Sequence, residues 1–88
     1  MQYQKHNYLI QVFKALGNSN RLKIVELLAN AKKPITVNKI CDEINLEQGL
    51  TSQHLTKLRD ADIVQAKQEG LYMHYSLKDE NIRKLLSL

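Results

Sequence analysis

The apolar residues of this 88-residue chain recur at helical spacing up to about residue 60 and at strand spacing only afterwards. Spacings of three and four residues mark one face of an amphipathic helix, whereas strict alternation marks a strand. The helical spacing predicts four helices, over about residues 4–16, 19–30, 37–44 and 48–60. Alternation then predicts two strands, over 63–67 and 71–77, before a last short helix from about 79 to 88.

Residues that favour turns and helix ends separate these segments. Gly17 is expected to end the first helix with a positive φ angle, and Asn18 or Ser19 is expected to cap the second. Thr36 is expected to cap the third helix, and Gly70 to supply the positive φ angle of a hairpin turn. The predicted order is therefore four helices, a hairpin and a final helix.

The order of these segments specifies the architecture. A helix, a tight turn and a second amphipathic helix with a polar outer face form a helix-turn-helix unit. Segments 37–44 and 48–60 fit this description, and the hairpin follows directly. The apolar positions of the second segment are Leu50, Leu55 and Leu58. We therefore predict a mainly α fold with a small β-hairpin, a winged helix-turn-helix, as a single domain covering 1–88.

Composition limits the function classes. The chain has 13 Lys and Arg against 9 Asp and Glu, a net charge of +4, and one cysteine, Cys41. A lone cysteine forms no internal disulfide, and a domain this small buries only a modest core, so we expect a second copy to complete it as a two-fold dimer. No apolar run approaches the ~20 residues of a membrane span. The first residues contain no signal-peptide core, which predicts a cytoplasmic protein.

The fourth helical segment carries polar residues opposite its apolar positions. A helix in the major groove of DNA needs donors and acceptors there: Gln addresses adenine, and Ser and Thr contact bases less selectively. Thr51, Ser52 and Gln53 are expected at the exposed front of the helix, facing base edges. The other predicted DNA contacts, to phosphates, bases or an adjacent groove, are Gln48, His54, Lys57, Lys39 and Lys67.

Several of these residues also fit a purely structural role. His54 fits a half-buried core position as well as a DNA contact. Lys67 fits a charge that protects an edge strand from aggregation. Tyr72 and Tyr75 fit packing on the strand better than stacking on bases.

Charge is unevenly distributed along the chain. Residues 51–75 contain three basic and three acidic side chains and are neutral as a stretch. Most of the basic excess lies outside this stretch, at Lys14, Arg21, Lys23, Lys32, Lys33, Lys39, Arg83 and Lys84. We expect the fold to bring some of these toward DNA, Lys39 especially, and to give a log-log salt slope of ~0.9 per phosphate neutralised.

Four stretches between residues 12 and 78 resemble the ArsR/SmtB family of small bacterial repressors in order and spacing. They read KALGNSNRLKI (14–24), LEQGLTSQHL (46–55), LRDADIV (58–64) and EGLYMHYSL (69–77). The second is similar to the family's recognition helix and the fourth to its wing. The resemblance implies a winged helix-turn-helix, a DNA operator and repression that an effector relieves.

The resemblance also implies a homodimer held by the first and last helices. On this chain the residues assigned to the dimer interface are Tyr8, Val12, Ile82, Leu85 and Leu86. The apolar stripe of the first helix fits the core of a single chain equally well, so both roles stay open at this point.

The chain departs from the metal sensors of that family. Their Cys-x-Cys pair at the start of the third helix is replaced by Thr36, Val37 and Asn38, and the last helix supplies no histidine. Because a zinc site needs about four N, S or O ligands, we expect neither a metal site nor a cofactor. Glu47 replaces a serine cap, and Asp62 replaces a glycine that takes positive φ, a conformation that Asp tolerates.

Two alternatives to a DNA-binding regulator stay open. One is a winged-helix module that binds protein, which would expose apolar residues on 48–57. The other is a metal- or redox-responsive repressor with a non-standard sensing site that uses Cys41 or the histidines His6, His54 and His74. An enzyme is not expected, because no nucleophile and base are spaced as a set and no glycine-rich phosphate loop is present.

Overall fold

The computed structural model describes residues 2–87, with side chains from Asn7 to Ser87. In this range the chain forms five α-helices and one three-stranded antiparallel sheet. In chain order the elements are α1 (Gln2–Leu16), α2 (Ser19–Asn30), β1 (Ile35–Thr36), α3 (Val37–Ile44), α4 (Gln48–Asp60), β2 (Val64–Glu69), β3 (Tyr72–Leu77) and α5 (Glu80–Leu86). All five predicted helices and both predicted strands are confirmed.

Side chains at the helix ends explain where the helices begin. The side-chain oxygen of Asn18 accepts hydrogen bonds from two backbone N–H groups in the first turn of α2, at 2.9 and 3.1 Å. Thr36 caps α3 and Asp79 caps α5 in the same way. Asn45 ends α3 in the left-handed conformation, with φ 56°. Gly17 follows α1 without a positive φ angle, so its predicted conformation is wrong; its N–H closes a tight turn onto a carbonyl three residues earlier, at 3.3 Å.

The sheet has one strand more than the sequence predicts. β2 and β3 form the expected hairpin, with Val64 paired to Leu77 and Glu69 to Tyr72. Gly70 takes φ 63° in the turn between them, as predicted. β1 pairs with β3 on its other side, which gives the order β1-β3-β2. Two residues are too few to show alternation, so no strand is predicted there.

The inner faces of the helices and the sheet meet in one hydrophobic core. Its buried members are Val12, Ala15, Ile24, Val25, Leu28, Ile40, Leu55, Leu58, Ala61, Ile63, Val64, Leu77 and Ile82. Burying one Val, Leu or Ile side chain contributes about 1.5–3 kcal/mol relative to leaving it in water. Leu50, one of the three apolar positions of α4, is 42% exposed and lies outside this core.

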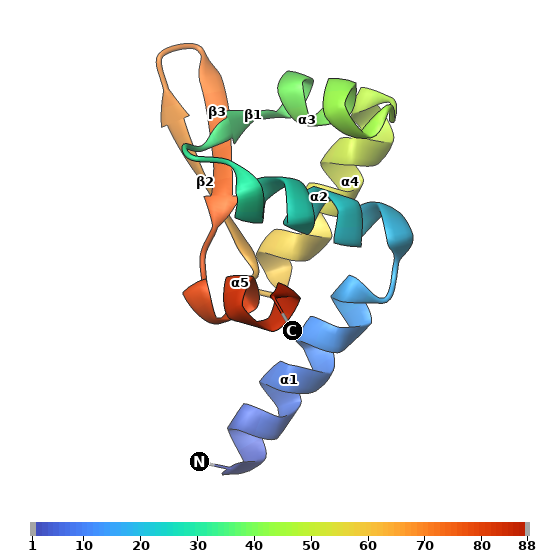
Figure 1. Ribbon diagram of the computed structural model, residues 1–88, viewed down its shortest axis with the longest axis vertical. Helices are drawn as coiled ribbons and strands as arrows, with labels where there is room; N and C mark the ends of the chain where they lie inside the picture. Colours follow the sequence, from blue (N-terminus) through green and yellow to red (C-terminus); the bar gives the residue numbers. More distant parts are fainter. Residues whose placement is uncertain (1, 88) are drawn as a thin grey trace.

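The arrangement of the elements separates two ends of the molecule (Figure 1). The β2–β3 hairpin, called the wing below, and the start of α4 lie at one end of the long axis. The N-terminal half of α1 lies at the other end, and α2 crosses the middle. Asp62, with φ 60°, turns the chain from α4 into β2, in the conformation expected for it. The wing therefore stands beside the α3–α4 pair, which confirms the predicted winged helix-turn-helix.

Candidate nucleic-acid interface

α4 is held through one face and exposes the other. Leu55 and Leu58, on its inner side, are at most 1% exposed. The predicted DNA contacts that lie exposed on α4 are Gln48, Ser52, Gln53 and Lys57. The outer face therefore offers amide, hydroxyl and ammonium groups of the kind that address base edges and phosphates.

Thr51 is not part of this outer face, so its predicted place at the exposed front of the helix is wrong. Its side chain is 0% exposed, and its hydroxyl donates to the Glu47 carbonyl at 2.9 Å. A Thr hydroxyl satisfied by the carbonyl one turn back tolerates burial. The helical rotation that turns Leu55 inward places Thr51 on the same side. The Glu47 side chain makes no capping hydrogen bond, as its residue type suggested.

His54 is half-buried and faces the start of α2 rather than open solvent. Its Nδ1 lies 3.4 Å from Nη1 of Arg21, which is a donor, so this nitrogen accepts. Burial lowers the pKa of His54 below its ordinary value of 6.5, and the nearby charges of Arg21 and Lys57 lower it further. His54 therefore acts as a neutral support between α4 and α2, which favours the half-buried alternative.

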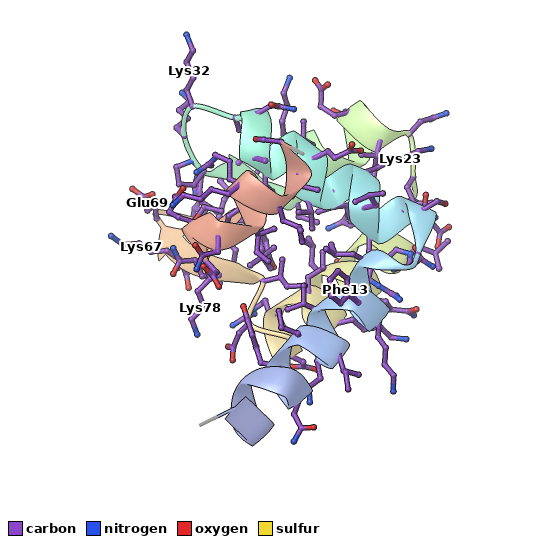
Figure 2. All side chains as sticks on the ribbon, turned by 60° about the horizontal axis from the view of Figure 1, so that its bottom comes forward. Phe13, Lys23, Lys32, Lys67, Glu69 and Lys78 are labelled. Atoms are coloured by element: carbon purple, nitrogen blue, oxygen red, sulfur yellow. The ribbon has the colours of Figure 1, made fainter. Side chains whose placement is uncertain are left out.

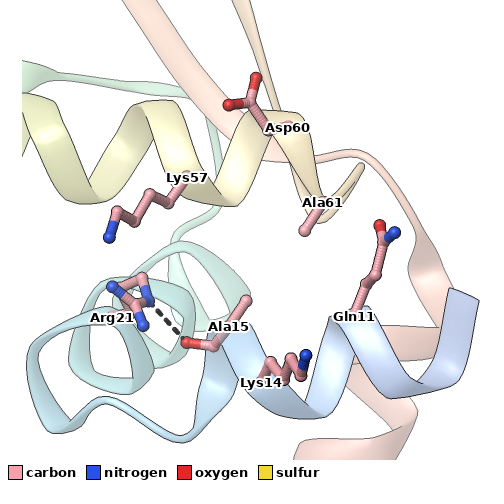
Figure 3. Close-up of a pocket in the computed structure, with 7 residues that line it drawn as sticks. All are labelled: Gln11, Lys14, Ala15, Arg21, Lys57, Asp60 and Ala61. Carbon is pink, nitrogen blue, oxygen red and sulfur yellow. Dashed lines mark hydrogen bonds between the residues drawn. The ribbon is translucent and has the colours of Figure 1, made fainter.

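Arg21 contacts the predicted site residue His54, a contact that sequence reasoning did not foresee. Its Nε donates to the Ala15 carbonyl at 2.8 Å (Figure 3), and its Nη1 donates to His54 at 3.4 Å. One guanidinium thus ties the end of α1, the start of α2 and the middle of α4 together. A half-buried Arg on the central helix was the available signal, but its partners are 6 and 33 residues away in sequence and are known only from the fold.

Three basic residues from different helices lie around one crevice, and the sequence did not indicate this cluster. Lys57 on α4 lines a crevice together with Lys14 on α1 and Arg21 on α2. Lys14 and Arg21, which lie outside the neutral stretch in sequence, are therefore brought next to α4 by the fold. Lys39, singled out in sequence, is exposed on α3 and forms an ion pair with Glu43 at 3.0 Å, which raises the pKa of Lys39.

The wing carries both a cation and an apolar tip. Lys67 on β2 is exposed and projects outward from the wing (Figure 2), and its cross-strand partner on β3 is His74. Leu71 lies in the turn and is 87% exposed, and Tyr72 is 57% exposed. The expected strand packing is therefore wrong for Tyr72, whereas Tyr75 is partly buried against the core.

The residues assigned to a dimer interface fall into two groups. Val12 and Ile82 are 2% and 4% exposed within the single chain, so their side chains belong to its core and offer no surface to a partner. Tyr8, Leu85 and Leu86 are half-buried and retain exposed area. Sequence reasoning missed three apolar residues of α1 that the single chain leaves exposed, namely Leu9, Ile10 and Phe13.

Other features bear on the alternative functions. Cys41 is a free, half-buried thiol. Among the side chains that the structure describes, no group of three or more His, Cys, Asp and Glu is placed to hold a metal ion. The side chain of His6, one of the histidines considered for sensing, lies outside the described residues. Along residues 2–87 no helix has the length and apolar character that crossing a membrane requires.

The fold and the exposed polar face of α4 define the class of this protein, a winged helix-turn-helix DNA-binding regulator. The sequence profile of the bacterial regulatory proteins of the arsR family matches residues 18–66. The chain belongs to this family. The resemblance of the four sequence stretches is thereby confirmed, and so is the prediction of a transcriptional regulator rather than an enzyme.

Relatives extend the likeness over nearly the whole chain. MJ1325 of Methanocaldococcus jannaschii, an uncharacterized HTH-type transcriptional regulator, is 35% identical over 85 residues, which are 97% of this chain and 94% of the relative. A homolog of the cadmium resistance transcriptional regulatory protein CadC from Staphylococcus aureus is 33% identical over 79 residues, 86% of this chain and 62% of the relative. The solved homodimeric winged helix-turn-helix domain of Mb0332 from Mycobacterium bovis has a TM-score of 0.87 at 27% identity, covering 98% of this chain and 78% of that one.

Proposed function

We propose that this chain is a repressor that binds a near-palindromic DNA operator as a homodimer. Each subunit places α4 in a major groove. The observation that carries the proposal is the division of α4 into a fully buried inner face and an exposed polar outer face. A helix braced in this way presents its side chains to base edges without having to reorganise when it binds.

Gln53 and Ser52 are the proposed base-reading residues. Both are exposed on the outer face of α4, and a Gln amide can donate to and accept from adenine at the same time. Leu50 is exposed on the same helix and suits contact with a thymine methyl group. With Thr51 turned inward, selectivity rests on fewer polar groups than the sequence suggested.

Contacts to the DNA backbone are proposed for residues on the flanks of α4. Gln48 begins the helix, where free backbone N–H groups favour a phosphate. Lys57, near the other end of the helix, is exposed. Lys39 and Lys67 extend the same surface onto α3 and the wing, and Lys39 has to give up part of its pairing with Glu43 to reach a phosphate.

The proposed dimer interface lies at the end of the molecule away from the wing. Leu9, Ile10 and Phe13 expose apolar surface on α1, and Tyr8, Leu85 and Leu86 retain partial exposure nearby. Homodimerisation of the solved Mb0332 domain supports such a partner for this chain. Residues 1–88 would then act as one unit for DNA binding and dimerisation in the cytoplasm, where the DNA lies.

The proposal is tested by selecting bound duplexes from random DNA at one stated salt concentration. We expect enrichment of a motif with dyad symmetry, whose half-sites are centred about 34–36 Å apart or a multiple of that. Failure to enrich any sequence, although the folded protein binds duplexes, would reduce the function to non-specific DNA binding. No binding to any duplex at low salt would overturn the proposal.

A second candidate is a winged-helix module that binds protein, and the apolar wing tip favours it. Leu71 and Tyr72 are exposed side by side in the sequence, and Leu50 adds an apolar side chain on α4. The polar residues Gln48, Ser52, Gln53 and Lys57 outnumber Leu50 on the exposed face of α4, and this favours DNA. The same selection experiment separates the two, because a protein-binding module enriches no duplex.

A further inference from the structure

A crevice of about 280 Å³ lies where α1, α2 and α4 meet. Three cations line it, one from each helix: Lys14, Arg21 and Lys57. Figure 3 shows the side chains of Lys57 and Arg21 directed toward one another across the crevice. The carboxylate of Asp60, which also lines the crevice, points away from both.

These three cations have no acidic partner in the part of the chain that the structure describes. The ion pairs found there join Lys39 to Glu43, Lys78 to Asp62 and Arg83 to Glu80. Like charges that face one another repel, and the repulsion is greater where the surroundings are partly buried, as they are at Arg21. The crevice therefore concentrates positive charge that the chain itself does not neutralise.

Contacts with Ala15 and His54 fix the position of the Arg21 guanidinium. Its Nε is committed to the Ala15 carbonyl at 2.8 Å and its Nη1 faces His54 at 3.4 Å. A guanidinium has five N–H donors, so donors are left over for a ligand in the crevice. Fixing the guanidinium in advance reduces the side-chain entropy that binding costs.

We propose that this crevice binds a phosphate group between Arg21 and Lys57, with Lys14 at its edge. Arg offers a planar fork that matches phosphate oxygens, and Lys adds a mobile point charge. The chemistry fits a backbone phosphate of DNA, which rests on the function proposed above, and it also fits a free phosphate. In either case the bound group touches Lys57 and the Arg21–His54 contact that supports α4, so its binding is linked to the position of that helix.

The first arm of the test uses the folded protein without DNA. Inorganic phosphate replaces chloride at constant ionic strength while amide chemical shifts are followed by NMR. Binding in the crevice predicts saturable shifts at Ala15, Arg21 and Lys57. Lys57→Gln removes one charge-assisted contact and should weaken this binding roughly tenfold.

Lys32→Gln is the matched control, because it removes the same charge from the loop after α2, at the end of that helix far from the crevice (Figure 2). It should leave phosphate binding unchanged. Lys14→Gln should weaken it less than Lys57→Gln. All three lysines are exposed, so the thermal unfolding midpoints of the variants should match the parent.

The second arm measures duplex binding by fluorescence anisotropy at several salt concentrations. A backbone phosphate in the crevice predicts that Lys57→Gln lowers the log-log salt slope by up to ~0.9 and that Lys14→Gln lowers it by less, while Lys32→Gln leaves it unchanged. Saturable phosphate shifts with unchanged slopes would assign the site to a free phosphate instead.

The inference is overturned if neither arm distinguishes Lys57→Gln and Lys14→Gln from Lys32→Gln. Failure of the phosphate-site proposal can be told apart from failure of the proposed DNA-binding function. A parent protein that binds no duplex would end the DNA proposal, and the NMR titration would still decide whether the crevice binds phosphate.

Discussion

The outer faces of α4 and α1 differ in how much apolar surface they expose, since Leu50 is the one large apolar side chain exposed on α4, whereas the described side chains of α1 include three. On α4, Leu55 and Leu58 are at most 1% exposed, and the outer side is mostly polar. On α1, Leu9 and Ile10 are each 42% exposed and Phe13 is 58% exposed. The apolar inner face of α4 is therefore fully buried within one chain, whereas the outer face of α1 leaves apolar side chains in contact with solvent.

This difference separates the two tasks of the molecule. A polar face braced by a finished core suits a ligand rich in hydrogen-bonding groups, such as DNA. An apolar patch on a small protein usually marks an interaction surface. We therefore assign recognition to α4 and assembly to α1.

The largest expected effect is on folding, through the inner face of α4. Leu55→Ala should lower the free energy of unfolding by about 2–5 kcal/mol, because it leaves a cavity in the core. Leu50→Ala is the matched control on the same helix, since Leu50 is 42% exposed, and it should cost far less. Urea denaturation measures both, and equal losses would show that α4 is not anchored by one face.

Next comes assembly through α1. Phe13→Ala should weaken association by about 1.5–3 kcal/mol, because the phenyl ring is no longer there to be buried against the partner. Leu71→Ala removes an even more exposed apolar side chain at the opposite end and should leave association unchanged. Sedimentation equilibrium decides: if the two variants behave alike, α1 is not the assembly surface.

Recognition is tested by two neighbouring residues of α4. Gln53→Ala should cost about 1–3 kcal/mol of operator binding and relax base preference at one position. Thr51→Val keeps the shape of a buried side chain whose hydroxyl serves only the helix, so operator binding should stay as in the parent. Anisotropy titrations with operator variants measure both, and a loss confined to Thr51→Val would reverse the assignment.

The smallest effect concerns the contact between α1 and the start of α5. The Tyr8 hydroxyl donates to Asp79 at 2.9 Å. Hydrogen bonds, first from the Asn81 backbone and then from Tyr8, lower the pKa of Asp79 from its ordinary 3.8. The stability that this carboxylate contributes is therefore complete above its unfolded pKa and is lost as the pH falls through its folded pKa.

Tyr8→Phe should lower the free energy of unfolding by about 0.5–1.5 kcal/mol near neutral pH. The difference from the parent should shrink as the pH falls through the lowered, folded-state pKa of Asp79, because the carboxylate is protonated there. Burial, followed by the contact with Asp79, raises the pKa of Tyr8 to about 12, so the parent should also lose stability as the pH rises from 10 toward that value. Tyr72→Phe, at an exposed tyrosine, is the control; the same pH profile in both variants would rule out the contact.

Much of the fold was predictable from local signals. The spacing of apolar residues gives the bounds of α4, and the cap residues Asn18 and Thr36 mark the starts of α2 and α3. The strand β1 was not predictable, because two residues carry no period and form a strand only by pairing with β3.

The site was less predictable than the fold. Residue type suggested that Thr51 is exposed, but the rotation of α4 on its core buries Thr51 and leaves the apolar Leu50 42% exposed. Arg21 could not be assigned, because its role depends on contacts with Ala15 and His54 that only the folded chain creates.

The central claim is that two copies of α4, related by symmetry, enter major grooves on one face of a duplex. Methylation protection of guanine N7 on the selected operator tests it directly, because this atom lies in the major groove. We expect two protected patches related by a dyad and centred about 34–36 Å apart, or a multiple of that. A single protected patch, or protection that does not depend on sequence, would contradict it.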